Sequence, residues 1–99
     1  MKYELRKTDI FDRWMARLKD RSATIKILAR LDRIENGNFG DHKQIDKNLF
    51  ELRFFFGPGY RIYYTIKGNT VVILLTGGNK TTQTKDIKKA MALLNDLEE

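Results

Sequence analysis

The stretch Leu49–Lys80, LFELRFFFGPGYRIYYTIKGNTVVILLTGGNK, decides the fold. Apolar and polar side chains alternate through most of it, and glycine-containing segments at 57–59 and 68–69 interrupt the alternation. Successive side chains of a strand point to opposite faces of a sheet. The stretch therefore predicts three strands in a meander, with one apolar face for the core and a second face that carries cations.

The two turns of this meander set an expected register. A three-residue loop at 57–59 pairs Phe54 with Ile62 and Leu52 with Tyr64, because core residues opposed across a strand pair must share a face. The same register gives two further pairs, Arg53 with Tyr63 and Phe55 with Arg61. A turn centred on Gly68-Asn69 adds Tyr63 with Leu74 and Arg61 with Thr76. Ile73 and Leu75 then join the core face.

The flanking segments predict one more strand, at residues 3–7, and three helices. Thr8 or Asp9 caps the first helix and Ser22 the second, and the third starts at Thr81-Thr82. Their apolar residues recur at helical spacing: Ile10, Phe11, Trp14, Met15 and Leu18; Ile27, Leu28, Leu31 and Ile34; and Ile87, Ala90, Met91, Leu94 and Leu97. Residues 39–47 are expected to form an irregular connector. Arg13, Arg17, Lys26, Arg30 and Arg33 are expected to form a solvated helical face, with docking of RNA or of a partner as the less favoured alternative.

This order of elements predicts a single α+β domain spanning residues 1–99. A helical hairpin and a C-terminal helix pack on a small, mainly antiparallel sheet in a β-α-α-β-β-β-α arrangement. The 99 residues suffice for one core and not for two domains. The absence of cysteine suits a reducing cytosol, and we expect no signal peptide, membrane span or metal site.

The net charge of +6 is unevenly distributed. Residues 1–40 hold ten Lys/Arg against six Asp/Glu (+4), residues 41–67 hold five against three (+2), and residues 68–99 are balanced. This excess favours a nucleic acid, an acidic protein or an anionic lipid as partner, without choosing among them, and it suits solubility alone equally well.

The expected register gathers three cations near one end of the sheet. Arg53 and Arg61 lie on neighbouring strands with Tyr63 between them, and Lys80 follows two glycines that let the backbone turn back. Guanidinium and ammonium groups bind phosphate oxygens, and Tyr63 and Phe55 could stack a base of single-stranded RNA. Solvated surface cations are an equally good interpretation.

In an RNA-cleaving site, these cations would stabilise the dianionic phosphorane that forms when a 2′-hydroxyl attacks the adjacent phosphate. Glu51 lies on the same face as a candidate base, and Lys80 could give or take a proton. His42, the single histidine, is expected to be a surface residue. No cofactor is implied.

Four segments resemble the RelE/ParE superfamily, and more narrowly the HigB-type "addiction module killer" toxins of type II toxin–antitoxin systems. They are Leu49–Arg53, Gly57–Tyr64, Val71–Leu75 and Gly77–Gln83. The Gly-Tyr-Arg of residues 59–61 is the strongest element for the superfamily. The Gly-Gly-Asn-Lys-Thr-Thr-Gln of residues 77–83 is the most specific for the branch.

The resemblance implies a ribosome-dependent mRNA interferase, which cleaves the message in the ribosomal A site, and an antitoxin partner of helix-turn-helix type. It implies phosphate contact by Arg61, with Arg53 and Lys80 near the family's other basic positions. The family's C-terminal catalytic Tyr or His has no clear counterpart, because Lys85-Asp86-Ile87 occupies that region. Alternatives are a non-catalytic toxin that binds DNA gyrase, as in the ParE branch, and a plain RNA-binding module or inert remnant.

Overall fold

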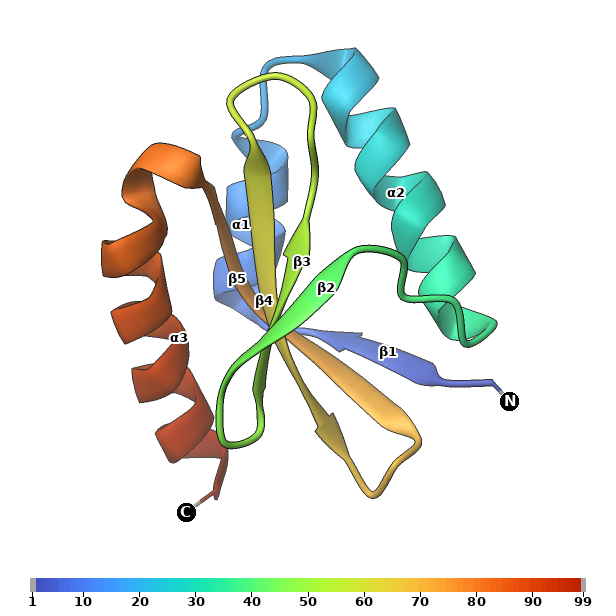
Figure 1. Ribbon diagram of the computed structural model, residues 1–99, viewed down its shortest axis with the longest axis vertical. Helices are drawn as coiled ribbons and strands as arrows, with labels where there is room; N and C mark the ends of the chain where they lie inside the picture. Colours follow the sequence, from blue (N-terminus) through green and yellow to red (C-terminus); the bar gives the residue numbers. More distant parts are fainter. Residues whose placement is uncertain (1, 99) are drawn as a thin grey trace.

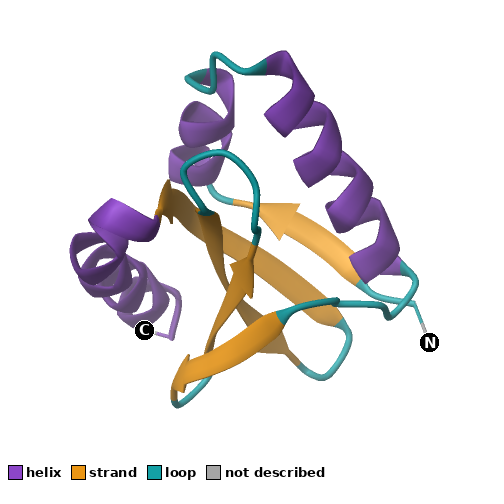
Figure 2. Ribbon diagram, turned by 45° about the horizontal axis from the view of Figure 1, so that its top comes forward, coloured by secondary structure: helices purple, strands orange, loops and turns teal. Residues whose placement is uncertain are grey.

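The computed structural model describes residues 2–98, in which three helices cover both faces of one five-stranded sheet (Figures 1 and 2). This arrangement confirms the α+β class. The elements in chain order are β1 (Glu4–Lys7), α1 (Asp9–Ala16), α2 (Arg21–Glu35), β2 (His42–Asp46), β3 (Leu49–Arg53), β4 (Tyr60–Lys67), β5 (Val71–Asn79), a 3₁₀ turn (Lys80–Thr82) and α3 (Gln83–Glu98).

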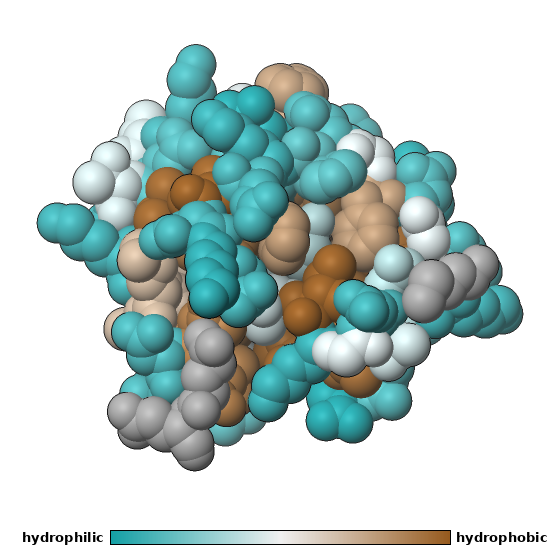
Figure 3. All heavy atoms as spheres, turned by 60° about the horizontal axis from the view of Figure 1, so that its bottom comes forward, coloured by the Kyte–Doolittle hydropathy of each residue, from teal (hydrophilic) through white to brown (hydrophobic). Residues whose placement is uncertain are grey.

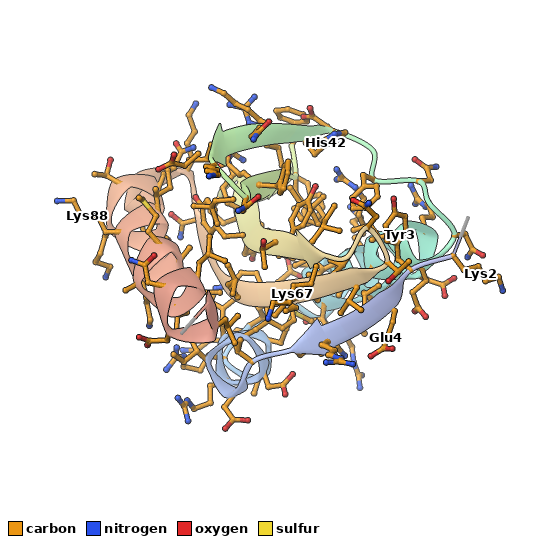
Figure 4. All side chains as sticks on the ribbon, turned by 90° about the horizontal axis from the view of Figure 1, so that it is seen from below. Lys2, Tyr3, Glu4, His42, Lys67 and Lys88 are labelled. Carbon is orange, nitrogen blue, oxygen red and sulfur yellow. The ribbon has the colours of Figure 1, made fainter. Side chains whose placement is uncertain are left out.

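The sheet has the strand order β1-β5-β4-β3-β2. β1 runs parallel to β5, and the other neighbours are antiparallel. β2 corrects the prediction of an irregular connector at 39–47, and it places exposed His42 on a strand at the outer edge of the sheet (Figure 4). This strand shows no apolar alternation, and it is held by its backbone pairing with β3 and by Ile45, which packs against the core beneath α3.

Two separate cores lie on opposite faces of the sheet. Buried residues of α1 and α2, including Phe11 and Ile27, pack on the first face. Ala90 and Leu94 of α3 pack on the second face. The prediction of a second face free to carry exposed cations is therefore wrong, because α3 covers much of that face. Ile73 and Leu75 belong to this second core and not to the first.

β3 and β4 pair two residues out of the expected register. Leu52 pairs with Ile62, and Arg53 lies directly opposite Arg61. The error arises at the turn, where residues 54–59 form a six-residue loop closed by a hydrogen bond of 3.1 Å from Phe54 N to Tyr60 O. A shift of two residues preserves which side chains share a face. The remaining pairs are Phe50 with Tyr64 and Glu51 with Tyr63.

The β4–β5 hairpin also departs from the expected register. Lys67 pairs with Val71, so the loop holds three residues, 68–70, with Asn69 at a φ of 62°. A bulge near Leu75 then shifts the pairing by one more residue. As a result Tyr63 pairs with Thr76 in place of Leu74, and Arg61 pairs with Gly78 in place of Thr76.

The sequence predicts that Gly77 and Gly78 let the backbone turn back. The structure corrects this prediction, because both glycines lie inside β5. A Cβ atom on Gly77 would overlap the indole of Trp14, and one on Gly78 would overlap the carboxylate of Asp86. The two glycines therefore seat a side chain from α1 on one face of the strand and a side chain from α3 on the other.

The starts of the helices follow capping rules. Thr8 caps α1 as expected, with its hydroxyl accepting from Phe11 N at 3.0 Å. Asp20, and not Ser22, caps α2, because its carboxylate accepts from the N–H groups of residues 22 and 23. Asn79 caps the 3₁₀ turn that leads into α3, and Thr82 returns a bond to its N–H.

Candidate functional site

The loop at 54–59, the start of β4 and the 3₁₀ turn line a surface hollow of about 300 Å³. It is lined by Phe54, Phe55, Gly57, Pro58, Gly59, Arg61 and Lys80. Three of the six residues expected in the site, Arg61, Lys80 and Phe55, therefore meet there. Phe55 and Arg61 come from the loop and the adjoining start of β4, and Lys80 comes from the 3₁₀ turn that follows β5.

The Arg61 guanidinium supports the loop that forms the hollow. Its Nη1 donates to Gly59 O and Tyr60 O at 3.2 Å each, and to Phe54 O at 3.5 Å. The side chain is buried, and its Nε has no hydrogen-bond partner among residues 2–98. Part of this cation is thus committed to structure, while the residue still lines the hollow.

Gly59 brings Arg61 and Lys80 close together. Its φ of 75° lies in the left-handed region that glycine adopts without strain. A Cβ atom at this position would lie 3.3 Å from Lys80 Cβ and 3.6 Å from Arg61 Nη1. The Gly-Tyr-Arg motif therefore packs its glycine directly against both cations of the hollow.

Phe55 is 78% exposed at the rim of the hollow. The two neighbouring rings of Phe54 and Phe56 make cation–π contacts with α2. Lys26 Nζ lies 4.7 Å from the centroid of the Phe56 ring, and the Arg30 guanidinium lies 4.7 Å from the centroid of the Phe54 ring. An exposed aromatic ring on an anchored loop suits base stacking, which leaves that part of the expectation open.

Arg53 and Glu51 lie outside the hollow and contact each other. Arg53 Nε is 3.3 Å from Glu51 Oε1, and Gln83 of α3 donates a hydrogen bond of 2.7 Å to Glu51 Oε2. Glu51 has no exposed surface, so its expected availability as a base is wrong for this conformation. Although Arg53 and Arg61 pair across the strands as neighbours, the Arg53 side chain is directed to Glu51.

Tyr63 is fully buried beneath α3, and its expected role in stacking an exposed base is therefore wrong for this conformation. Burial raises the pKa of the Tyr63 hydroxyl, and the negative charge of Glu51 raises it further. Tyr63 is thus a neutral phenol in the second core.

Sequence reasoning missed three polar residues with structural roles. Gln83 reaches Glu51, and Asp86 accepts a hydrogen bond from the Thr82 hydroxyl above Gly78. Arg30, expected to be solvated, donates to the carbonyls of residues 39, 41 and 53, and burial lowers its pKa. The sequence contains one weak indication that Gln83 and Asp86 face the sheet: each precedes a residue of the apolar stripe of α3, Ile87 or Ala90, by four positions.

Residues 2–98 contain no group of three or more metal-ligating side chains of the His, Cys, Asp and Glu type. Within the same range, every helix is too short or too polar to cross a membrane. Hydrophilic side chains dominate the face shown in Figure 3, with apolar patches between them.

Solved structures show that this fold is the RelE fold. A chain of the toxin–antitoxin complex RelBE2 from Mycobacterium tuberculosis superposes with a TM-score of 0.65 at 19% identity, covering 81% of this chain and all of that one. A double mutant of the E. coli toxin RelE in the free state superposes with a TM-score of 0.68 at 16% identity, covering 93% and 97%.

The sequence itself places the chain in a narrower group. Residues 13–95 match the family model "Phage derived protein Gp49-like (DUF891)", and the chain belongs to that family. An uncharacterized protein of Haemophilus influenzae is 45% identical over 97 residues, which cover 98% of each chain. The expected RelE-like fold is therefore confirmed, whereas the narrower HigB assignment stays a prediction.

Proposed function

We propose that the protein is the toxin of a toxin–antitoxin pair and cleaves mRNA in the ribosome, as its resemblance to HigB-type toxins implies. The observation that carries this proposal is the hollow in which Arg61, Lys80 and Phe55 meet. The RelE fold supports it, because the superposed structures come from a toxin–antitoxin complex and a toxin. Such a protein acts in the cytoplasm.

In this proposal the hollow binds one phosphodiester of the message. Lys80 supplies an exposed charge, Arg61 orients the loop and adds its own positive charge, and Phe55 stacks on a base. The 2′-hydroxyl of the message attacks the adjacent phosphate, and the two cations stabilise the charge that develops on the phosphorane. The bond from phosphorus to the 5′-oxygen of the next nucleotide then breaks, leaving a 2′,3′-cyclic phosphate and a 5′-hydroxyl, and the proton lost by the 2′-hydroxyl passes through water to the departing 5′-oxygen. The ribosome contributes by holding the message in a reactive geometry.

The partner in this proposal is an antitoxin, of the helix-turn-helix type that the resemblance implies. The net charge of +6 favours an acidic contact segment in that partner, since opposite charges accelerate association. Coexpression of the neighbouring open reading frame should therefore suppress toxicity, and the two proteins should copurify.

Inducible expression, followed by mapping of message 5′ ends, tests the activity. The expected result is growth arrest with cleavage at ribosome-occupied codons. Lys80→Ala and Phe55→Ala should each reduce cleavage, for Lys80 by about 10²-fold, which is typical of losing one group that stabilises transition-state charge. Both side chains are exposed, so these variants should remain folded.

Two variants serve as matched controls. Lys88→Ala removes an exposed lysine of α3 that points away from the body of the molecule (Figure 4), and Ile25→Ala removes an exposed apolar side chain of α2. Neither should change cleavage. If Lys80→Ala and Phe55→Ala cleave as well as these controls, the hollow is not the RNA site.

A second candidate function is a toxin that binds its target, such as DNA gyrase, without chemistry. The observation that favours it is the burial of Glu51 and Tyr63, which leaves the hollow as described without a carboxylate or a phenol. A DNA-damage response on induction, with intact messages, would support this candidate over RNA cleavage.

A further inference from the structure

A second hollow, of about 440 Å³, lies between α1 and α3 on the open side of β5. Trp14 of α1 and Arg17, which caps that helix, contribute to one wall, and Lys85, Asp86 and Lys89 of α3 contribute to the other. Residues 76–79 at the end of β5 form the floor of the hollow, and Figure 1 shows the ribbon of β5 running toward the start of α3. This volume lies in the range of about 300–1,000 Å³ that small-molecule sites occupy.

The floor of this hollow is a strand edge that β1 does not cover. β1 pairs only with Val71–Leu74. Tyr60 O accepts a hydrogen bond from Phe54 N, so the polar backbone groups of Tyr60 point toward β3. Backbone N–H and C=O groups alternate in direction along a strand, so those of Ile62 point toward β3 as well. Gly77, the partner of Ile62, therefore directs its N–H and C=O away from β4, toward the hollow.

The walls of the hollow carry more positive than negative charge. Arg17, Lys85 and Lys89 set three cations against the single carboxylate of Asp86, which leaves two positive charges. Asp86 is already engaged, because it accepts the hydroxyl of Thr82 and is almost fully buried. The three cations are exposed, so they remain available to an anionic ligand.

An aromatic surface stands beside these cations. The Trp14 indole rests on Gly77, is partly buried and contacts Phe11 and Tyr60 at centroid distances of 5.8 and 6.3 Å. The ring is thus held in place while it lines the hollow. Fixed aromatic rings with nearby cations are the elements that bind the base and the phosphate of a nucleotide.

The geometry points to a nucleotide-binding site in this hollow, with the base against Trp14 and the phosphate between Arg17 and the two lysines of α3. The structure favours a nucleotide over an acidic peptide that would pair as an added strand with the open edge of β5. Within residues 76–79, Gly77 is the residue whose N–H and C=O both face the hollow, since Asn79 already bonds Thr82 and the others face β4. The site is separate from the loop hollow and does not depend on the proposed RNA cleavage.

Trp14 provides a direct readout, because it is the single tryptophan of the chain. The purified protein is titrated with AMP and with GMP while indole fluorescence is excited at a wavelength that neither nucleotide absorbs. Parallel titrations use adenosine, guanosine, inorganic phosphate, a short oligoribonucleotide and a polyglutamate peptide. We expect a saturable change with at least one nucleotide, and at least tenfold weaker responses to its nucleoside and to phosphate.

Charge variants locate the ligand. Lys85→Gln, Lys89→Gln and Arg17→Gln should each raise the half-saturating nucleotide concentration about tenfold, as expected for the loss of one hydrogen bond to a charged group. Lys88→Gln and Arg13→Gln are matched controls on the same helices, outside the hollow, and should leave binding unchanged. Lys80→Ala should also leave it unchanged, which separates this site from the loop hollow.

The source of the nucleotide follows from two of the titrations. Equal affinity for mononucleotide and oligoribonucleotide supports a free nucleotide, and tighter binding of the oligoribonucleotide supports an RNA strand. Three results overturn the proposal: phosphate binding as tightly as nucleotide, a response to polyglutamate alone, or no nucleotide-induced change in either Trp14 fluorescence or, in a parallel NMR titration, the backbone amide resonance of Gly77.

Discussion

Gln83, in the first turn of α3, donates a hydrogen bond of 2.7 Å to Glu51, a carboxylate with no exposed surface on the central part of β3. This contact joins the start of the last helix to the sheet. A buried charge must be hydrogen-bonded to be tolerated. The position of α3 over the second face is thus fixed by a polar contact at its start and by Ala90 and Leu94 farther along.

Loss of the Gln83 amide should destabilise the protein. Gln83→Ala leaves one oxygen of a buried carboxylate without its partner, and the expected loss is about 1–3 kcal/mol in the free energy of unfolding, measured by urea denaturation. Thr84→Ala, at the next and exposed position, is the control. Equal stability of the two variants would contradict the role given to this hydrogen bond.

Arg30 should be irreplaceable by lysine. Its guanidinium donates to Asp41 O at 2.6 Å, Arg53 O at 2.8 Å and Phe39 O at 3.1 Å, and it lies over the Phe54 ring. Lysine cannot reach three carbonyls with this planar geometry. Arg30→Lys should therefore lower the free energy of unfolding by about 2–3 kcal/mol, whereas Arg33→Lys, at an exposed position, should leave it nearly unchanged.

Stability should fall above about pH 10, where unfolded tyrosines ionise. Burial raises the pKa values of Tyr63 and Tyr64 in the folded state, so both phenols stay neutral there after they would ionise in the unfolded chain. Their contribution is complete below the unfolded pKa and is lost as pH rises toward the folded pKa. Urea denaturation at pH 8–11 should show a shallower decline for Tyr64→Phe; an unchanged slope would refute this.

Gly77→Ala and Gly78→Ala should each destabilise the protein. The added methyl group meets the Trp14 indole in the first case and the Asp86 carboxylate in the second. Overpacking of this kind costs about 1–3 kcal/mol. Thermal unfolding of both variants, beside exposed Thr70→Ala in the same hairpin, measures the effect. A melting temperature equal to that of the Thr70 variant would show that the glycines are not required for packing.

Strand alternation predicted the faces of β3 and β4 correctly, but it placed Ile73 and Leu75 of β5 on the wrong face and could not fix the register. Leu52, Ile62 and Tyr64 share the first core as expected, because a two-residue shift leaves each side chain on its face. The shift itself depends on the six-residue loop that Arg61 holds through three carbonyls, a contact with no pattern in the sequence. No sequence pattern predicts the bulge at Leu75 either.

A different sequence pattern, the continuous apolar run, indicates the second core. The runs Tyr60–Ile66 and Val71–Leu75 are nearly continuous in apolar residues, a pattern typical of strands buried on both faces. That pattern, together with the stripe of the last helix, indicates a helix over the face of Glu51 and Tyr63. The meeting of Arg61, Lys80 and Phe55 was anticipated only in part, since Phe55 reaches the hollow from the loop and not from a strand.

The back-to-back seating of two helices on Gly77 and Gly78 has an evolutionary consequence. A side chain can appear at position 77 only if the indole at 14 is replaced by something smaller, and at position 78 only if the carboxylate at 86 withdraws. Selection for folded variants from a library randomised at these four sites should return correlated pairs, 77 with 14 and 78 with 86, and few single changes.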